Sequence, residues 1–327
     1  MNITIMKSIK LSLLLSLALS LCLLALSCNK AGSGGSGKPK IAVIPKGVSH
    51  NFWLSIKAGA DAAGQELGAE ILWKGPAVET DYTGQINIVE DFVNKQVDGI
   101  VLAPSSGDAL VTPVKKAKAA GIPVVIIDSG INWEDYAAYI STDNRKGGVI
   151  AAERMGEVLN GKGKVAILGV KKGSVSTDER EDGFKEAIKK FPGITVVDFQ
   201  YGDADRAKSL NTAMDILTKN PDLSGFFASN ESSAVGVFNA AKAKGVAGYI
   251  KIVGFDSSPD LIAAVKAGII DSLVVQDPYK MGYEGVKAAL NQKAGKPVER
   301  RLDTGVELVK KDNLDTPKIQ NLIKDRK

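Results

Sequence analysis

Apolar residues from Lys40 onward fall into short continuous runs separated by longer amphipathic stretches. Runs that are apolar at consecutive positions are typical of strands in a parallel sheet covered on both faces. The first predicted strands are residues 41–44, 71–73, 99–102 and 124–127. The predicted helices between them are residues 52–67, 82–94 and 109–120. This alternation predicts a doubly wound α/β domain.

The same alternation then restarts in the second half of the chain. Its predicted strands are residues 165–168, 196–199, 225–228, 250–253 and 272–275. Its predicted helices are residues 183–191, 204–218, 233–244, 259–267 and 281–290. Two similar halves in tandem predict an α/β protein with two doubly wound parallel-sheet lobes.

Polar segments follow most of the predicted strands. They are residues 45–51, 104–108, 128–132, 173–182, 230–233 and 256–260, and we expect all of them to be loops. In doubly wound sheets, ligands bind beyond the carboxyl ends of the strands, where loops lead into helix N-termini. Two lobes that present such edges to each other form a cleft, which is a favoured place for small ligands.

The N-terminal segment has the layout of an export signal. Lys7 and Lys10 precede an apolar run over residues 11–26, which is shorter than the ~20 residues of a permanent membrane span. Residues 25–28 (Ala-Leu-Ser-Cys) resemble a lipobox, so we expect a lipoprotein signal peptide at 1–27 and lipidation of Cys28. Residues 28–37 then form a Gly/Ser tether.

Composition narrows the function classes. The net charge of +5 arises from 42 basic and 37 acidic residues that are interspersed along the chain, so no nucleic-acid partner is expected. The only cysteines are Cys22 and Cys28, which leaves the body without a disulfide or thiol site. A single histidine, His50, argues against a histidine metal cluster, and we expect neither a cofactor nor a metal.

Several motifs in order carry a family resemblance. They are residues 51–53, Asp128, 141–144, 178–184, 228–231, 253–260 and 276–277. Together they resemble the periplasmic sugar-binding proteins of ABC transporters, of the ribose-binding type, over about residues 40–311. The resemblance implies a type I Venus-flytrap fold with a three-segment hinge near residues 142–144, 276–277 and 304–305. The lobes would be 38–142 plus 277–303, and 143–276 plus 304–327.

The resemblance also implies a sugar-binding site. Asp128 and Asp256 would accept protons from sugar hydroxyls, Arg180 and Asn230 would reach the ring or its hydroxyls, and Gln276 would bind at the hinge. These planar polar groups suit vicinal hydroxyls, and burying them is costly unless a ligand satisfies them. The alternatives are structural: the aspartates and Asn230 as helix caps, and Arg180 in a surface ion pair.

Five further residues complete the predicted set. One of Phe52 and Trp53 would stack on the sugar, although both could be core residues, and Phe255 is a further aromatic candidate. His50 is either a contact or an exposed surface residue. Lys46 departs from the ribose-type pattern and resembles a ligand-touching lysine of the autoinducer-2 receptors.

The ligand therefore stays open among a pentose, a hexose, a polyol and a furanose signal. Ser129 and Ala103 stand where the ribose type usually has an Arg and an Asn, which argues against D-ribose itself. The expected partner is an ABC permease, with a chemoreceptor as the alternative. We expect a monomeric binding protein, not an enzyme; a glycosidase and a sugar-responsive repressor are the rejected alternatives.

Overall fold

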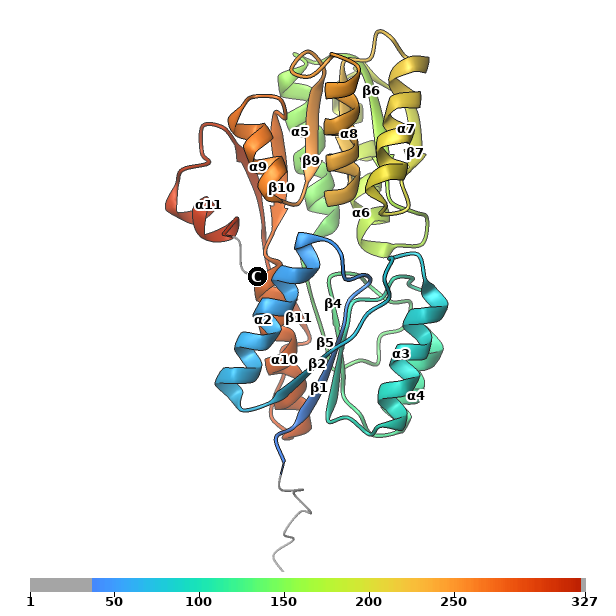
Figure 1. Ribbon diagram of the computed structural model, residues 1–327, viewed down its shortest axis with the longest axis vertical. Coiled ribbons are helices and arrows are strands. Elements are labelled where there is room, and N and C mark those ends of the chain that lie inside the picture. Colours follow the sequence, from blue (N-terminus) through green and yellow to red (C-terminus); the bar gives the residue numbers. More distant parts are fainter. Residues whose placement is uncertain (1–36, 325–327) are drawn as a thin grey trace, which may run out of the picture. The chain divides into compact units, whose positions relative to one another are not determined.

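The computed structural model describes residues 37–324, and these contain two parallel-dominated α/β sheets (Figure 1). The first sheet has the order β11-β5-β4-β3-β1-β2 and is parallel throughout. Its strands are β1 (Lys40–Ile44), β2 (Glu70–Trp73), β3 (Gly99–Leu102), β4 (Val124–Ile127), β5 (Ala138–Ser141) and β11 (Arg301–Asp303). The central strands β3 and β4 are buried at every position, as continuous apolar runs predict.

Helices cover both faces of this first sheet. They are α2 (Asn51–Leu67), α3 (Tyr82–Asn94), α4 (Val111–Ala119) and α10 (Pro278–Lys293). One apolar core joins α2 and α10 to the sheet, and a second joins α3 and α4 to its other face. Side chains alternate along each strand between these two cores, which is why the strands read as unbroken apolar runs.

The second sheet repeats the plan with the order β12-β10-β9-β8-β6-β7. Its strands are β6 (Lys162–Gly169), β7 (Gly193–Tyr201), β8 (Gly225–Ala228), β9 (Lys251–Phe255), β10 (Ser272–Gln276) and β12 (Val306–Lys310). Only β12 runs antiparallel, against β10. This second sheet confirms the prediction of two α/β lobes.

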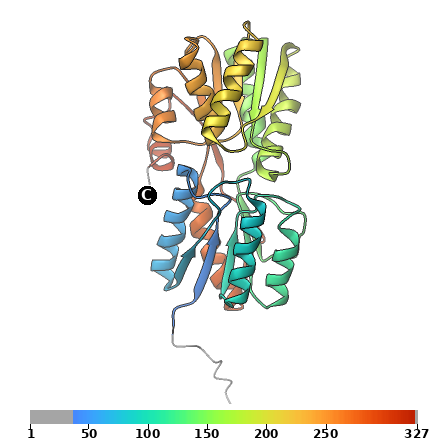
Figure 2. The ribbon, with the colours of Figure 1, turned by 45° about the vertical axis from the view of Figure 1, so that its right-hand side comes forward.

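Helices again lie on both faces, as Figure 2 shows from a second side. One core involves α5 (Asn144–Val158), α6 (Val175–Ala187) and the short 3-10 helix η1 (Ile188–Lys190). The opposite core involves α7 (Arg206–Lys219), α8 (Glu231–Ala243), α9 (Pro259–Lys266) and α11 (Pro317–Leu322).

The chain passes between the two sheets three times. It leaves the first sheet after β5 at Ser141, returns to it after β10 at Gln276, and leaves it again after β11 at Asp303. The segments that precede α5, join β10 to α10, and join β11 to β12 make these passages, and each is short.

One sequence prediction about local structure was wrong. Residues 173–182 were expected to be a loop and 183–191 a helix, but α6 already begins at Val175 and ends at Ala187. The first turns of α6 carry polar residues that face away from its core, so they show no apolar periodicity. Arg180 therefore lies on a helix rather than in a loop.

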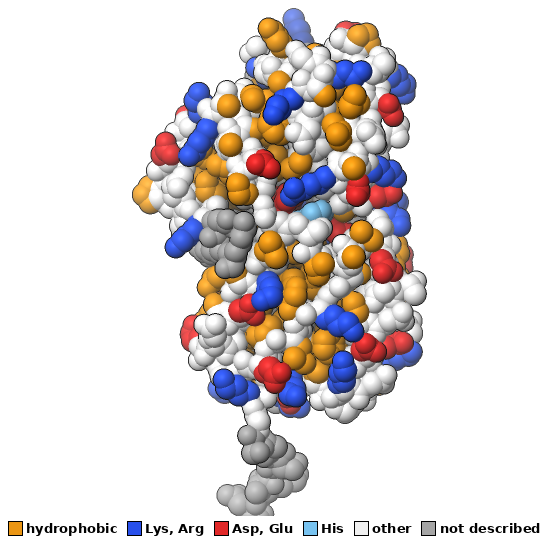
Figure 3. Space-filling model, in the orientation of Figure 1, with side chains coloured by type: hydrophobic (Ala, Val, Ile, Leu, Met, Phe, Trp, Pro, Cys, Tyr) orange, Lys and Arg blue, Asp and Glu red, His pale blue; other side chains and the backbone are white. Residues whose placement is uncertain are grey.

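Charged side chains are interspersed on the face drawn in Figure 3, as the sequence indicated. Within residues 37–324, no helix is both long and apolar enough to cross a membrane. The proposed signal peptide, most of the tether and the proposed lipidation site Cys28 lie outside the described residues.

Glycines allow two helices to approach closely in the second lobe. A Cβ added at Gly148 of α5 would stand 2.0 Å from the carbonyl oxygen of Arg180 on α6, and one at Gly183 would stand 2.3 Å from that of Arg145. The contact brings the backbone of α6, and with it Arg180, against α5.

We predict that Gly148→Ala lowers the free energy of unfolding by about 1–3 kcal/mol, because overpacking at backbone contact outweighs the better helix propensity of Ala. Urea unfolding followed by circular dichroism measures the change. Gly37→Ala is the control, since nothing lies within 4 Å of its added Cβ. Equal stability of the two variants would contradict the close approach.

Candidate functional site

A cavity of about 20 Å³ lies where the carboxyl ends of strands from both lobes come together. Its lining residues are Lys46, His50, Phe52, Trp53, Glu79, Asp128, Ser176, Thr177, Arg180, Asn230, Glu231, Asp256 and Gln276. A larger hollow beside it shares Phe52, Asp256 and Gln276 but lacks Lys46, Arg180 and Asn230. The concentration of buried polar groups marks the smaller cavity as the candidate site.

Asp128 and Asp256 occupy equivalent places in the two lobes. Asp128 follows β4 and Asp256 follows β9, and each backbone N–H donates to a carbonyl oxygen of the neighbouring strand. Both have left-handed backbone conformations, with φ of 61° and 67°. Such conformations cost an L-residue about 1–2 kcal/mol, and residues held in them cluster at functional sites. Neither aspartate is the N-cap residue of a helix, although Asp256 Oδ2 accepts from the first backbone N–H of α8.

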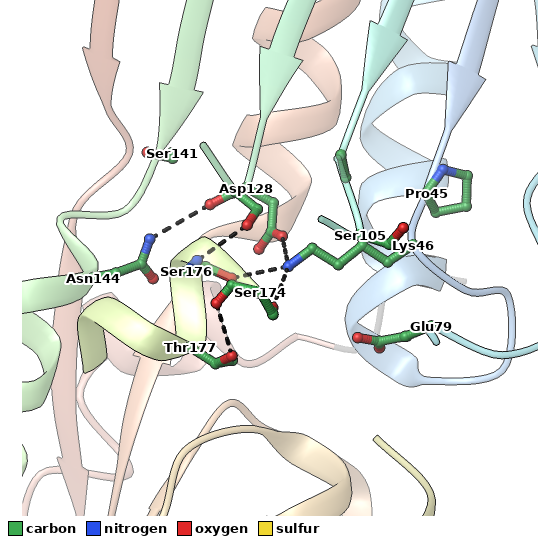
Figure 4. A network of polar contacts seen from close by, with 12 residues as sticks. Pro45, Lys46, Glu79, Ser105, Asp128, Ser141, Asn144, Ser174, Ser176 and Thr177 are labelled. Carbon is green, nitrogen blue, oxygen red and sulfur yellow. Dashed lines mark hydrogen bonds and ion pairs between the residues drawn. The ribbon is translucent and has the colours of Figure 1, made fainter. Parts of the chain in front are cut away.

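Lys46 bridges the two lobes beside Asp128 (Figure 4). Its Nζ lies 2.9 Å from Asp128 Oδ2, and it donates to Ser176 Oγ at 2.9 Å and to Ser174 Oγ at 3.3 Å. The lysine is only 3% exposed, so an unpaired charge there would be costly. Because a lysine ammonium has three N–H groups, these three contacts use all of them.

Arg180 is held rigidly from α6. Its Nε donates to Asn144 Oδ1 at 2.9 Å and its Nη1 to the Ser229 carbonyl oxygen at 3.0 Å. Its guanidinium also lies 3.9 Å from the ring centre of Phe255. At 2% exposure it is not in a surface ion pair, which excludes that alternative. These contacts leave three of its five N–H donors for other partners.

Asp256 faces Arg180 across the cavity and is fully enclosed. Its Oδ1 accepts from Gln276 Nε2 at 2.6 Å, and its Oδ2 accepts from the backbone N–H of Glu231 at 3.0 Å. Burial raises the pKa of this carboxyl to about 6, although the charge of Arg180 and the Gln276 hydrogen bond act in the opposite direction.

His50 is buried, so the exposed-surface alternative is excluded. Its Nδ1 lies 3.0 Å from Glu79 Oε1, which also accepts from Trp53 Nε1 at 2.8 Å. Burial lowers the pKa of His50, but the hydrogen bond and charge of Glu79 outweigh it and raise the pKa above the ordinary value of 6.5. Burial raises the pKa of Glu79 and His50 lowers it, with a net decrease.

Asn230 is the N-cap of α8, as one alternative had it. Its Oδ1 accepts from the backbone N–H of Ser233 and from Ser232 Oγ, both at 3.0 Å. These two hydrogen bonds to Oδ1 fix the orientation of the amide and do not involve its Nδ2. Capping and ligand contact are thus compatible roles for Asn230.

The structure brings nine of the ten predicted site residues to the cavity and leaves out one. Phe255 is fully buried in the core of α5 and α6, and it supports Arg180 from behind. Sequence reasoning missed Glu79, Glu231, Ser176 and Thr177. Glu79 follows β2, and the rule that sites form at strand ends would have found it. Glu231 directly follows Asn230 and showed no signal of its own.

One buried acceptor in this region is unsatisfied. Gln276 Oε1 has no hydrogen-bond partner among the described residues, whereas Asp128 Oδ2 has the Lys46 ion pair. Leaving a buried acceptor unpaired costs about 1–3 kcal/mol. Residues 37–324 contain no group of three or more His, Cys, Asp or Glu side chains that could hold a metal ion.

Two α/β lobes whose strand ends enclose a polar cavity define the class of two-lobed solute-binding proteins. The chain belongs to the periplasmic binding protein family: residues 41–297 match the model described as a periplasmic binding protein domain.

Individual relatives agree with the family. The chain is 33% identical to the D-allose-binding periplasmic protein of Escherichia coli, over 79% of this chain and 86% of that one. It is 34% identical to the D-ribose/D-allose-binding protein of Pseudomonas aeruginosa, over 83% and 89%. An ABC transporter solute-binding protein from Agrobacterium vitis with bound D-fucose is similar in structure, with a TM-score of 0.85, 41% identity, and 87% and 99% covered.

We predict that His50 stabilises the fold in a pH-dependent way. Its folded-state pKa is raised, so its contribution is present below pH 6.5 and is lost as the pH rises through the folded-state pKa. The melting temperature of His50→Gln should therefore lie further below that of the unmodified protein at pH 6 than at pH 9. Asp91→Asn, in an exposed ion pair, is the control. A difference that does not change with pH would contradict the charged His50–Glu79 pair.

Proposed function

We propose that this chain captures a monosaccharide or similar small polyol in the cavity between its lobes. The observation that carries the proposal is the set of unused polar groups there. Gln276 Oε1 is a buried acceptor, while Arg180 and Asn230 retain donors. A polyhydroxylated ring satisfies both kinds at once, because each hydroxyl donates one hydrogen bond and accepts others.

Aromatic side chains provide the apolar part of the site. Phe52 and Trp53 both line the cavity, and both belong to the apolar core beneath α2. A core role and a role in ligand stacking are therefore compatible for each of them. Their rings contact edge to face with centroids 4.9 Å apart. We propose Phe52 as the ring that packs on the C–H face of the sugar, since Trp53 is oriented by its bond to Glu79.

The remaining parts of the proposal follow the family. The lobes comprise residues 38–142 plus 277–303, and 143–276 plus 304–327, and they close about the three connecting segments. The protein is exported, anchored through lipidated Cys28, monomeric, and delivers its ligand to an ABC permease. It binds without catalysing a reaction. Delivery to a chemoreceptor is the alternative for the partner.

The furanose-signal alternative rested on Lys46. In this structure its three N–H groups are taken by Asp128, Ser174 and Ser176, which favours a bridging role over ligand contact. The bound sugars named for relatives include D-allose, D-arabinose and D-fucose, which are the first compounds to test.

We predict that one sugar among pentoses, hexoses, polyols and autoinducer-2 raises the melting temperature of the protein in a concentration-dependent manner. A ligand present at 100 times its dissociation constant stabilises by about 2.7 kcal/mol. Arg180→Met should weaken binding at least about tenfold, because it leaves ligand acceptors unpaired. Differential scanning fluorimetry and calorimetry measure both effects.

Arg145→Met is the matched control, since Arg145 forms an exposed ion pair on the same lobe. The absence of any shift across the panel would overturn the assignment of a sugar ligand. Binding that persists unchanged in Arg180→Met would place the sugar elsewhere. Release of nitrophenol from aryl glycosides would contradict binding without catalysis.

We predict that sugar affinity falls as the pH drops below about 6. Hydroxyl groups that donate to Asp256 favour its charged form, so its pKa of about 6 decreases in the complex. Below that pH, binding must release a proton, and affinity decreases by up to about tenfold per pH unit. Calorimetry at pH 5 and pH 7.5 measures this, and Asp256→Asn should remove the dependence. A flat profile in the unmodified protein would contradict it.

A further inference from the structure

Helix α2 lacks an N-terminal cap from its own lobe. Its N-cap residue, His50, makes no side-chain capping hydrogen bond, and its first turn has no acidic residue. The first N–H groups of a helix have no partner within the helix, and helices usually satisfy them with a nearby side chain. Here that side chain comes from the other lobe.

Glu231, at the start of α8, supplies the missing acceptor. Its Oε2 accepts from the backbone N–H of Phe52 at 3.0 Å, and its Oε1 lies 3.4 Å from that of Asn51. The side chain of Glu231 is only 1% exposed, and Arg206 pairs with it at 2.6 Å. A carboxylate at a helix N-terminus gains from both the hydrogen bonds and the helix dipole.

Glu231 is also linked to a predicted sugar contact. Its backbone N–H donates to Asp256 Oδ2 at 3.0 Å, and it directly follows Asn230. Phe52, whose backbone N–H donates to the Glu231 carboxylate, lines the same cavity. The interaction therefore joins ligand-facing residues of one lobe to a ligand-facing residue of the other.

We propose that Glu231 is a positioning residue for lobe closure: it caps α2 only when the lobes are together, and so stabilises the closed conformation independently of the ligand. The effect of Glu231 on sugar binding rests on the proposed function. Its effect on lobe closure without sugar does not. Because α2 has no local cap, opening exposes its N-terminal N–H groups to water, and closing restores a charged acceptor. The apparent affinity of a ligand that binds the closed form rises only as far as the cap raises the closed fraction, and opening and closing become slower or faster with the cap.

Two other hydrogen bonds between the lobes make the proposal testable. The backbone N–H of Gly107 donates to the Gly173 carbonyl oxygen at 3.2 Å, and that of Ser176 donates to Ser129 Oγ at 3.0 Å. Neither involves Glu231 or Arg206. Amide hydrogen exchange at these positions therefore reports separation of the lobes rather than loss of the cap alone.

We expect Glu231→Ala in the full chain to accelerate exchange about tenfold, the effect of losing one charged hydrogen bond, both at Asn51 and Phe52 and at Gly107 and Ser176. Mass spectrometry of the exchanged protein, without sugar, measures this. Glu186→Ala is the matched control, because Glu186 forms an exposed ion pair on the same lobe. Faster exchange confined to α2 would overturn the proposal, since it would show a local cap only.

Asn51→Pro provides a second variant in which Glu231 is intact. It removes one N–H that faces the carboxylate, and proline is well tolerated as the first residue of a helix. We expect a smaller acceleration at Gly107 and Ser176, and no further change when it is combined with Glu231→Ala. Unchanged exchange at both amides in both variants would overturn the proposal.

The sugar found by the thermal screen then tests the functional consequence. Because the closed form predominates without sugar and the sugar enters and leaves through the open form, Glu231→Ala should accelerate association and dissociation about tenfold each and leave the affinity within about twofold. Accelerated exchange with unchanged association and dissociation rates would overturn the coupling to binding. If no sugar binds the unmodified protein, the proposed function fails, while the exchange experiment still decides whether Glu231 holds the lobes together.

Discussion

Burial of charge between the lobes is the constraint on which the rest of the structure depends. Lys46, Asp128, Arg180 and Asp256 are each at most 5% exposed, and isolated charges in such surroundings are strongly unfavourable. Each is therefore paired: Lys46 with Asp128 and serines, and Arg180 with Asn144, a backbone carbonyl and the ring of Phe255. These partners come from different strands and helices, so the charge pairs also fix how those elements lie.

The pairing is incomplete in a way that favours a ligand. Gln276 retains a buried unpaired acceptor. Burial disfavours the charged form of Asp256 and raises its pKa to about 6. Asp128 and Asp256 additionally hold left-handed backbones, which a non-glycine residue adopts at a cost. Such unfavourable features persist in proteins where ligand binding offsets them. The strained backbones, the unpaired acceptor and the cavity therefore all support the same site.

Much of the fold follows from local pattern, but the site only partly does. Strands such as β3 and β4 are apolar throughout because they are covered on both faces, and their limits were predicted to within a residue. Helix α6 was missed at its start because its first turns face the polar cavity and lack apolar periodicity. Phe255 was predicted as a further aromatic candidate, but alternation along β9 turns it into the core.

The sequence by itself determined two α/β lobes and the strand ends at which polar side chains gather, because apolar periodicity and strand-end chemistry are local properties. Its ordered motifs supplied the family resemblance. Only the tertiary structure decided that Lys46 bridges the lobes and that Glu231 caps a helix 180 residues earlier. Such contacts depend on distances between elements that are remote in the chain. No local pattern encodes those distances, which the packing of helices on two separate sheets sets.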